Sequence, residues 1–274
     1  MNYRHVFHAG NHADVFKHAV LALILEHLRA KPRPFAVLDT HAGLGAYDLT
    51  SEDALRTREF EAGAGRVFGR DLPPARAYLD LLAEMNPGGL TTYPGSPELA
   101  ARMLRAGDRL ILCELHPDDA AALKRRYRRD GRVHVHHRDG YEAVRALTPP
   151  PERRGLVLID PPFEAPDEAE RLASALTDGL RRWPAGVFAA WYPIKDSRIG
   201  DLLSSAAKRG AFPRALRAEF LACPIDGARM AGGGLLITNA PWKLDEALGA
   251  LGQALAPVLG DGAASWRIDR LTSA

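Results

Sequence analysis

The alternation of short apolar runs with amphipathic helical segments limits most strongly what this chain can fold into. Seven runs have the length and side-chain pattern of strands, and helical patterns separate most of them. Strands that alternate with helices form parallel βαβ units, so we predict an α/β fold with a seven-stranded, mostly parallel sheet covered on both faces. The predicted strands are Phe35–Asp39, Arg109–Glu114, Val133–His137, Leu156–Asp160, Val187–Trp191, Leu216–Leu221 and Gly234–Thr238.

An amphipathic helix is predicted over residues 11–30, ahead of the first strand. Asn11 can cap its start, apolar residues recur at helical spacing, and Lys31-Pro32 ends it. Between residues 47 and 94 the apolar runs disappear, and polar helical segments interrupted by prolines replace them. We therefore predict one domain over residues 1–274, with a helical insertion at 47–94 after the first strand.

The composition excludes several classes of protein. With 274 residues, 46% hydrophobic and 26% charged, the chain can bury a substantial core and is not disordered. Its two cysteines, Cys113 and Cys223, lie far apart and form no metal or disulfide motif, which favours a reducing compartment. Neither a secretory leader nor a membrane-spanning run is visible, so we expect a cytoplasmic protein with no membrane partner.

Acidic residues stand at the ends of the first four predicted strands. Asp39 and Glu114 end the first two, Asp139-Gly140 follows the third, and Asp160 ends the fourth. The carboxyl ends of parallel strands meet at one edge of a sheet, so we expect these residues to share a ligand site. An acid after the second strand can accept hydrogen bonds from both ribose hydroxyls of a nucleoside, and an acid after the third can accept from the adenine amino group.

The glycine turn after the first strand indicates which nucleoside cofactor binds. It reads Gly43-Leu-Gly45, lacks the third glycine of a dinucleotide fingerprint, and has Asp48 where a diphosphate would meet a negative charge. S-adenosylmethionine has no phosphate and is cationic at its sulfonium and ammonium groups, so the turn favours it. A dehydrogenase or a non-catalytic nucleotide-binding module on the same fold is the alternative from another class.

The sharpest motif is Asp160-Pro161-Pro162-Phe163 at the end of a buried strand. Two prolines make a rigid corner that holds a carboxylate and an aromatic ring in fixed positions. The tetrapeptide resembles the motif of methyltransferases that modify planar amino groups, including the N6 nitrogen of adenine. In that chemistry Asp160 accepts a hydrogen bond from the amino group, and Phe163 stacks on the base.

Motifs along nearly the whole chain, from Tyr3 to about Trp266, resemble one family. They are YRHVFHAGNHADVFKH at residues 3–18, LDTHAG, YPGSP, ELHP, IDPPF, WYP and PWKL. Together they resemble the RlmJ family of bacterial 23S ribosomal RNA adenine N6-methyltransferases. One departure is Phe163, which stands where many relatives have tyrosine; it keeps the stacking face and lacks the hydroxyl.

The resemblance implies a Rossmann-like class I S-adenosylmethionine-dependent methyltransferase that modifies one adenine of 23S rRNA. We expect the rRNA to be protein-free or an early assembly intermediate, and the enzyme to be a monomer. By resemblance, the catalytic corner is Asp160, Pro161, Pro162 and Phe163. The implied cofactor contacts are His18, His41, Ser96, Glu114, Asp139, Gly140 and Asp160, and the implied substrate-side residues are Tyr3, His5, Lys17 and Phe163.

One alternative substrate remains open. The same chemistry could act on DNA adenine, on cytosine N4 or on a protein glutamine.

Four histidines lie near the N-terminus, but none has a carboxylate at a known metal-ligand spacing, so we predict no metal site. They are His5, His8, His12 and His18.

The formal net charge of +2 does not by itself indicate a nucleic-acid partner. Basic residues are nevertheless concentrated locally, in the run at 124–129. Such a run is most often a solvated helix face, although it could also contact RNA phosphates. The sequence does not decide between this run and the arginines of the insertion, which are Arg56, Arg58, Arg66 and Arg70.

Overall fold

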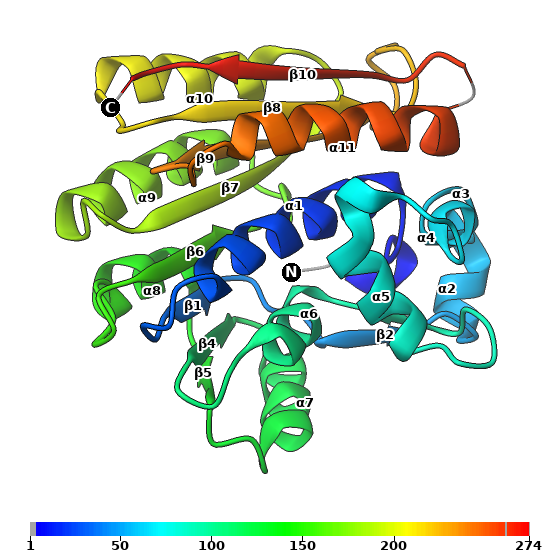
Figure 1. The fold of residues 1–274 in the computed structure, drawn as a ribbon, viewed down its shortest axis with the longest axis horizontal. Helices are drawn as coiled ribbons and strands as arrows, with labels where there is room; N and C mark the ends of the chain where they lie inside the picture. Colours follow the sequence, from blue (N-terminus) through cyan, green and yellow to red (C-terminus); the bar gives the residue numbers. More distant parts are fainter. Residues whose placement is uncertain (1–3, 261, 274) are drawn as a thin grey trace.

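The computed structural model describes residues 4–260 and 262–273, and its centre is an eight-stranded sheet (Figure 1). The strand order is β10-β8-β9-β7-β6-β1-β4-β5. The five strands from β5 to β7 in this order are parallel, whereas β9 is antiparallel to both of its neighbours and β10 is antiparallel to β8. The bounds are β1 (Ala36–Asp39), β4 (Arg109–Glu114), β5 (Val133–His137), β6 (Gly155–Ile159), β7 (Val187–Ile194), β8 (Leu216–Leu221), β9 (Gly232–Thr238) and β10 (Ser265–Arg270).

The predicted Rossmann-like α/β class is confirmed, and all seven predicted strands are present. Six lie within two residues of their expected bounds, and β7 extends three residues further, to Ile194. The predicted strand count was too low by one in this sheet. The additional strand, β10, lies at the edge and pairs with β8 from Ser265 opposite Leu221 to Arg270 opposite Leu216. Its side chains are exposed or only half-buried, so it has no apolar run for a sequence pattern to detect.

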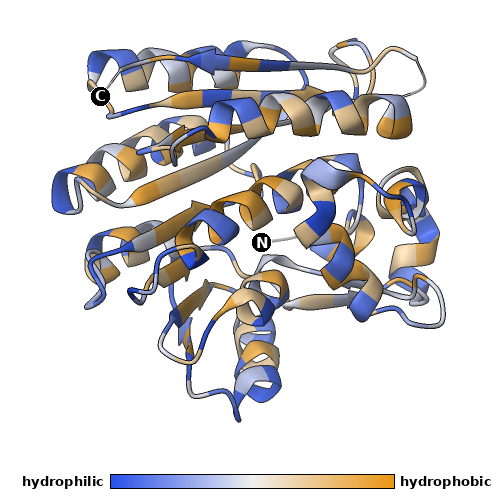
Figure 2. Cartoon of the chain, viewed as in Figure 1, coloured by the Kyte–Doolittle hydropathy of each residue, from blue (hydrophilic) through white to orange (hydrophobic). Residues whose placement is uncertain are grey.

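Helices cover both faces of the sheet and bury two hydrophobic clusters (Figure 1). In Figure 2 the central strands are largely apolar, and hydrophilic residues gather on outer helix turns such as the end of α7. One face is covered by α1 (His12–Arg29), α6 (Ser96–Met103), α7 (Pro117–Tyr127) and α11 (Leu244–Leu259). The other is covered by α8 (Gly140–Leu147), α9 (Glu168–Arg182) and α10 (Arg198–Arg209).

Helix α1 positions several residues of the site described below. Its start is capped as the sequence predicted, because Oδ1 of Asn11 accepts a hydrogen bond from the Asp14 backbone N–H at 2.9 Å. Phe16 anchors the helix to the sheet by stacking on Phe220 with 5.7 Å between ring centroids. In the described part of the chain, no helix combines the length and apolar character that crossing a membrane requires.

Between β1 and β4 the chain leaves the main sheet and forms a group of short helices, at the right of Figure 1. This group is bracketed by two paired antiparallel strands, β2 (Ala46–Asp48) and β3 (Thr92–Pro94). That residues 47–94 form an inserted subdomain within a single domain stays a proposal. Its helices are α2 (Glu52–Thr57), α3 (Glu59–Ala62), α4 (Ala64–Val67), η2 (Pro73–Ala75) and α5 (Arg76–Glu84), and a further turn, η1 (His5–Phe7), precedes α1.

Candidate active site

A cavity of about 1120 Å³ lies at the carboxyl ends of the central parallel strands. This is the edge at which a doubly wound sheet binds its ligands. Tyr3 lies outside the described residues, whereas all the other residues predicted to form the site line this cavity. They are His5, Lys17, His18, His41, Ser96, Glu114, Asp139, Gly140, Asp160, Pro161, Pro162 and Phe163. The chemical role assigned to each stays a prediction.

A chain of charged side chains connects the N-terminal segment to the carboxylate of Asp160. The Nζ of Lys17 lies 2.6 Å from Oδ2 of Asp160 and 2.8 Å from Oδ1 of Asp14. The other carboxylate oxygen of Asp14 lies 3.0 Å from Nε2 of His5 and also accepts the Gly10 backbone N–H at 3.0 Å. One buried ammonium group is therefore shared by two carboxylates.

The charge states in this chain follow from the contacts. Burial lowers the pKa of Lys17, but the charges of Asp14 and Asp160 outweigh that effect and hold the pKa above its usual range. Burial likewise raises the pKa of Asp14, and the neighbouring His5 and Lys17 outweigh it, so the pKa falls well below its usual range. Lys17 is therefore an ammonium ion and Asp14 a carboxylate.

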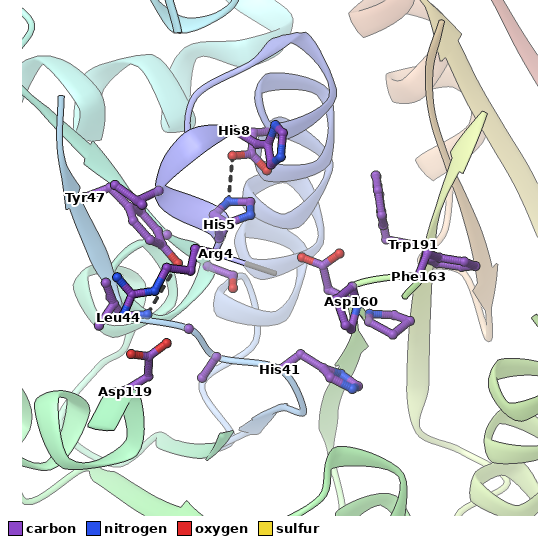
Figure 3. Close-up of a pocket in the computed structure, with 18 of the residues that line it drawn as sticks. Arg4, His5, His8, His41, Leu44, Tyr47, Asp119, Asp160, Phe163 and Trp191 are labelled. Carbon is purple, nitrogen blue, oxygen red and sulfur yellow. Dashed lines mark hydrogen bonds and ion pairs between the residues drawn. The ribbon is translucent and has the colours of Figure 1, made fainter. Parts of the chain in front are cut away.

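The DPPF corner forms the wall beside this charge chain. Pro161 is buried, and the backbone of Phe163 has φ of +52°, a left-handed conformation that non-glycine residues rarely adopt and that is concentrated at functional sites. The Phe163 ring packs edge-on against Trp191, with 6.0 Å between centroids. Nζ of Lys17 lies 5.2 Å from the centre of the Trp191 ring. Figure 3 shows Asp160 between this aromatic pair and the side chains of Arg4 and His5.

Glu114, at the end of β4, holds the glycine turn in place. Its Oε2 accepts the backbone N–H of Gly43 at 2.8 Å, and its Oε1 accepts that of His116 at 2.8 Å. A carboxylate has about four acceptor positions, so each oxygen can accept a further hydrogen bond from a ligand in the cavity. Gly43 itself has φ of +58°, and a Cβ there would lie 2.3 Å from the Tyr47 hydroxyl, so a larger residue would be strained and would displace Tyr47.

Asp139 caps the helix that follows β5. Its Oδ1 accepts the backbone N–H groups of Tyr141 at 2.9 Å and Glu142 at 3.0 Å, which fixes the first turn of α8 at the cavity. The next residue, Gly140, packs directly on the β1 loop, since a Cβ on it would lie 2.2 Å from the carbonyl oxygen of Thr40. Asp139 lines the cavity, and its second carboxylate oxygen lies 3.6 Å from a guanidinium nitrogen of Arg171.

His41, which is half-buried, and His18, which is buried, are neutral histidines in the cavity wall. Burial lowers the pKa of His41 to about 4 and that of His18 to about 3. Nδ1 of His41 is hydrogen-bonded to the Thr40 hydroxyl at 2.7 Å, and Nδ1 of His18 to the Tyr93 hydroxyl at 2.8 Å. Ser96 is buried nearby, in the first turn of α6.

Asp39 does not join the other strand-end acids in the cavity, which corrects the expectation from sequence. It is 1% exposed and lies behind the lining residues. Burial raises its pKa to about 7, and its Oδ2 has no hydrogen-bond partner among the described residues. In the sheet register Asp39 stands opposite Leu112 and Leu158, two residues before Glu114 and Asp160, so it does not reach the level of those acids.

Two residues of the cavity wall were missed or left undecided from sequence. Asp14 received no role, although its spacing of three residues from Lys17 on one helix was a signal that the pair would meet. Trp191 stands at the end of a predicted strand, where an aromatic residue can serve packing or substrate contact, and the structure places it in the cavity wall. Across residues 4–260 and 262–273, no group of histidine, cysteine and acidic side chains is arranged to hold a metal ion.

Comparison with known proteins gives consistent matches over nearly the full chain. A family model described as "Ribosomal RNA large subunit methyltransferase D, RlmJ" matches residues 32–272. A ribosomal RNA large subunit methyltransferase J of Escherichia coli (strain K12) is 41% identical over 251 residues, which cover 90% of this chain and 89% of the relative. Its namesake in Haemophilus influenzae is 39% identical, with 99% of each chain covered.

A solved structure shares the fold. The crystal structure of a Legionella pneumophila protein is similar with a TM-score of 0.89 and 32% sequence identity. The similarity covers 96% of this chain and 98% of that one, so the main sheet, its helices and the inserted segment are all shared.

Proposed function

The chain belongs to the RlmJ family of ribosomal RNA large subunit methyltransferases, and on that premise we propose that it transfers a methyl group from S-adenosylmethionine to the N6 nitrogen of an adenine in 23S rRNA. The observation that carries this proposal is the position of the Asp160 carboxylate. It is anchored on one oxygen by Lys17 and stands in the cavity beside Phe163 and Trp191.

The cavity fits S-adenosylmethionine and leaves room for a nucleotide. Small-molecule sites usually occupy about 300–1,000 Å³, and this cavity is larger. Glu114 retains acceptor capacity for ribose hydroxyls, and Asp139 presents one carboxylate oxygen to an adenine amino group. Asp48 and Asp118 also line the cavity, which disfavours a diphosphate and suits a cation.

When bound, S-adenosylmethionine supplies an electrophilic methyl group on a sulfonium centre that leaves as a neutral thioether. The protein has to orient the attacking nitrogen, whose lone pair is delocalised into the adenine ring. A hydrogen bond from the amino group to Asp160 would localise that lone pair and aim it. Lys17 occupies Oδ2, so Oδ1 is the acceptor we assign to the amino group. The proton that the methylated nitrogen loses would pass to this oxygen and then to water.

The aromatic pair supports the base while it reacts. An adenine can reach this cavity only after it leaves its own stack, and aromatic side chains commonly receive such a base. Phe163 offers the ring face, and the edge-on contact with Trp191 fixes its orientation. The two prolines before Phe163 keep its distance from Asp160 constant.

The N-terminal segment completes the proposed substrate side. His5 and Lys17 are joined through Asp14, so a base that contacts His5 is coupled to the carboxylate that holds the amino group. We extend the proposal to protein-free or early assembly 23S rRNA as the substrate, and to a monomer in the cytoplasm as the working enzyme. Methylation of protein-free rRNA tests the proposed substrate, and sedimentation of the enzyme tests whether it is a monomer.

The direct test uses radiolabelled S-adenosylmethionine and 23S rRNA from a strain that lacks the modification, followed by nucleoside analysis. We expect label in N6-methyladenosine at one site. If the RNA takes up no label, or if the label lies in another nucleoside, the substrate assignment is wrong. DNA and protein from the same cells serve as competing acceptors, because label in methyladenine or methylcytosine of DNA, or in glutamine, would indicate the related amino methyltransferases. Binding of NAD instead of S-adenosylmethionine would indicate a dehydrogenase.

A further inference from the structure

The basic run at the end of α7 contains an arginine that pairs with other protein groups and arginines that do not. Arg126 is tied to the protein itself, since its Nε lies 2.9 Å from Oε2 of Glu98 and its guanidinium lies 6.0 Å from the centre of the Tyr127 ring. Arg125, Arg128 and Arg129 are exposed, and within the described residues no carboxylate lies at ion-pair distance from them. These three residues, called the α7 basic stripe below, are not used to hold the fold together.

The α7 basic stripe begins at the cavity. Asp118, Ala122 and Arg125 follow one another at helical spacing on one face of α7, and all three line the cavity. Arg128 is the C-cap of α7 and Arg129 follows it in a turn, so these two lie just beyond the end of the helix whose last turn carries Arg125. Figure 2 shows this end of α7 as strongly hydrophilic.

The arginines of the inserted segment are used differently. Arg58 pairs with Glu61 at 2.6 Å, Arg66 donates to a backbone carbonyl of α11 at 3.3 Å, and the Arg56 guanidinium lies over an aromatic ring. Arg70 is exposed but does not line the cavity. Of the two basic regions left open by the sequence, the α7 basic stripe therefore offers guanidinium groups next to the site.

Exposed side chains of both signs line the cavity, and cations outnumber acids among them. Its less exposed carboxylates, such as Glu114, Asp119 and Asp139, suit a cationic cofactor and would repel phosphate. The exposed cations are Arg4, Arg125, Arg171, Lys195 and Arg229, and the exposed acids are Asp48, Asp118 and Glu164. The net charge of +2 means that this positive potential is local.

The geometry points to the α7 basic stripe as a docking surface for the RNA backbone that flanks the target adenine. This inference rests on the proposed function and adds to it the path by which the substrate strand leaves the cavity. Guanidinium groups bind phosphate oxygens in a bidentate manner, so Arg125 at the cavity and Arg128 and Arg129 just beyond the end of α7 would hold the strand while one base occupies the site.

The test compares the triple variant R125Q/R128Q/R129Q with the control K208Q/R209Q. Lys208 and Arg209 are exposed basic residues in the last turn of α10, as Arg125 is in α7, but they do not line the cavity. Affinity for protein-free, unmodified 23S rRNA is measured between about 0.05 and 0.2 M salt. The triple variant should bind RNA about tenfold more weakly. The slope of the logarithm of the binding constant against the logarithm of the salt concentration should fall in magnitude by about 2, because each lost phosphate contact removes about 0.7.

The control variant should keep the wild-type salt slope and turnover. In the triple variant the defect should appear in KM for RNA, while the affinity for S-adenosylmethionine stays within about twofold of wild type. An unchanged salt slope in the triple variant would overturn the inference while the wild type still methylates RNA. If the wild type methylates no RNA, the proposed function itself fails, and the two failures are thus distinguishable.

Discussion

Nζ of Lys17 lies 2.6 Å from Oδ2 of Asp160, although the two residues are 143 positions apart in the chain. This contact joins helix α1 to the DPPF corner. It also determines which carboxylate oxygen of Asp160 remains for a substrate amino group. Because Asp14 holds the same ammonium group from the other side, the position of Asp160 depends on residues of the N-terminal motif.

Replacement of Asp160 by asparagine should lower kcat by about 10²–10⁴, since the amino group loses its anionic acceptor. The cofactor dissociation constant should change by less than about threefold, which equilibrium binding of labelled S-adenosylmethionine measures. Asp167→Asn is the matched control, because Asp167 is an exposed carboxylate close in sequence that does not line the cavity. Near-normal turnover of D160N would remove Asp160 from its assigned role.

Lys17→Met should destabilise the fold by about 3–5 kcal/mol, because it leaves the buried carboxylate of Asp14 without its ammonium partner. The double variant D14N/K17M should lose less stability than the sum of the two single variants, which urea denaturation measures. Lys31→Met, a change of an exposed lysine, serves as the control. Strict additivity would show that Asp14 and Lys17 are not coupled.

Phe163→Ala should reduce kcat/KM for RNA by about 10–100-fold, the equivalent of about 1–3 kcal/mol of base stacking. Phe163→Tyr should stay close to wild type, because it keeps the ring that packs on Trp191. Steady-state kinetics with 23S rRNA checks both variants. Equal activity of the alanine and tyrosine variants would place the base elsewhere.

The pKa of His18 is lowered by burial to about 3, so the unfolded chain binds a proton there that the folded chain does not. The stability contributed by neutral His18 is fully present above about pH 6.5 and is lost as the pH falls towards 3. Between pH 7 and 5 the wild type should lose about 2 kcal/mol more stability than His18→Asn. Denaturant midpoints at both pH values check this, and parallel pH profiles would contradict it.

Gly140→Ala should weaken cofactor binding by at least about tenfold, because the added Cβ would clash with the Thr40 carbonyl oxygen and displace the first turn of α8. Asp139 caps that turn, so its free oxygen would move with it. Gly131→Ala is the matched control, since a Cβ there meets no atom within 4 Å. Calorimetric titration with S-adenosylmethionine distinguishes the two.

The sequence predicted that acids at strand ends would share one edge of the sheet. Glu114 ends β4, Asp139 stands two residues after β5 and Asp160 follows β6 directly, and the topology of a parallel sheet brings all three to one cavity. Asp39 was the exception. A residue at a strand end is buried when the neighbouring strands extend beyond it, and the sequence does not show how far they extend. Strand β10 was also missed, since an exposed edge strand carries no apolar pattern.

By itself, the sequence determined the α/β class, the glycine turn and the DPPF corner, because these follow from local periodicity and from the stereochemistry of glycine and proline. Only the tertiary structure decided that Lys17 is shared between Asp14 and Asp160, and that Arg126 serves the fold while Arg125 faces the cavity. Side chains with the same charge acquire different roles from the groups that packing brings within a few ångströms of them, and sequence spacing does not specify those groups.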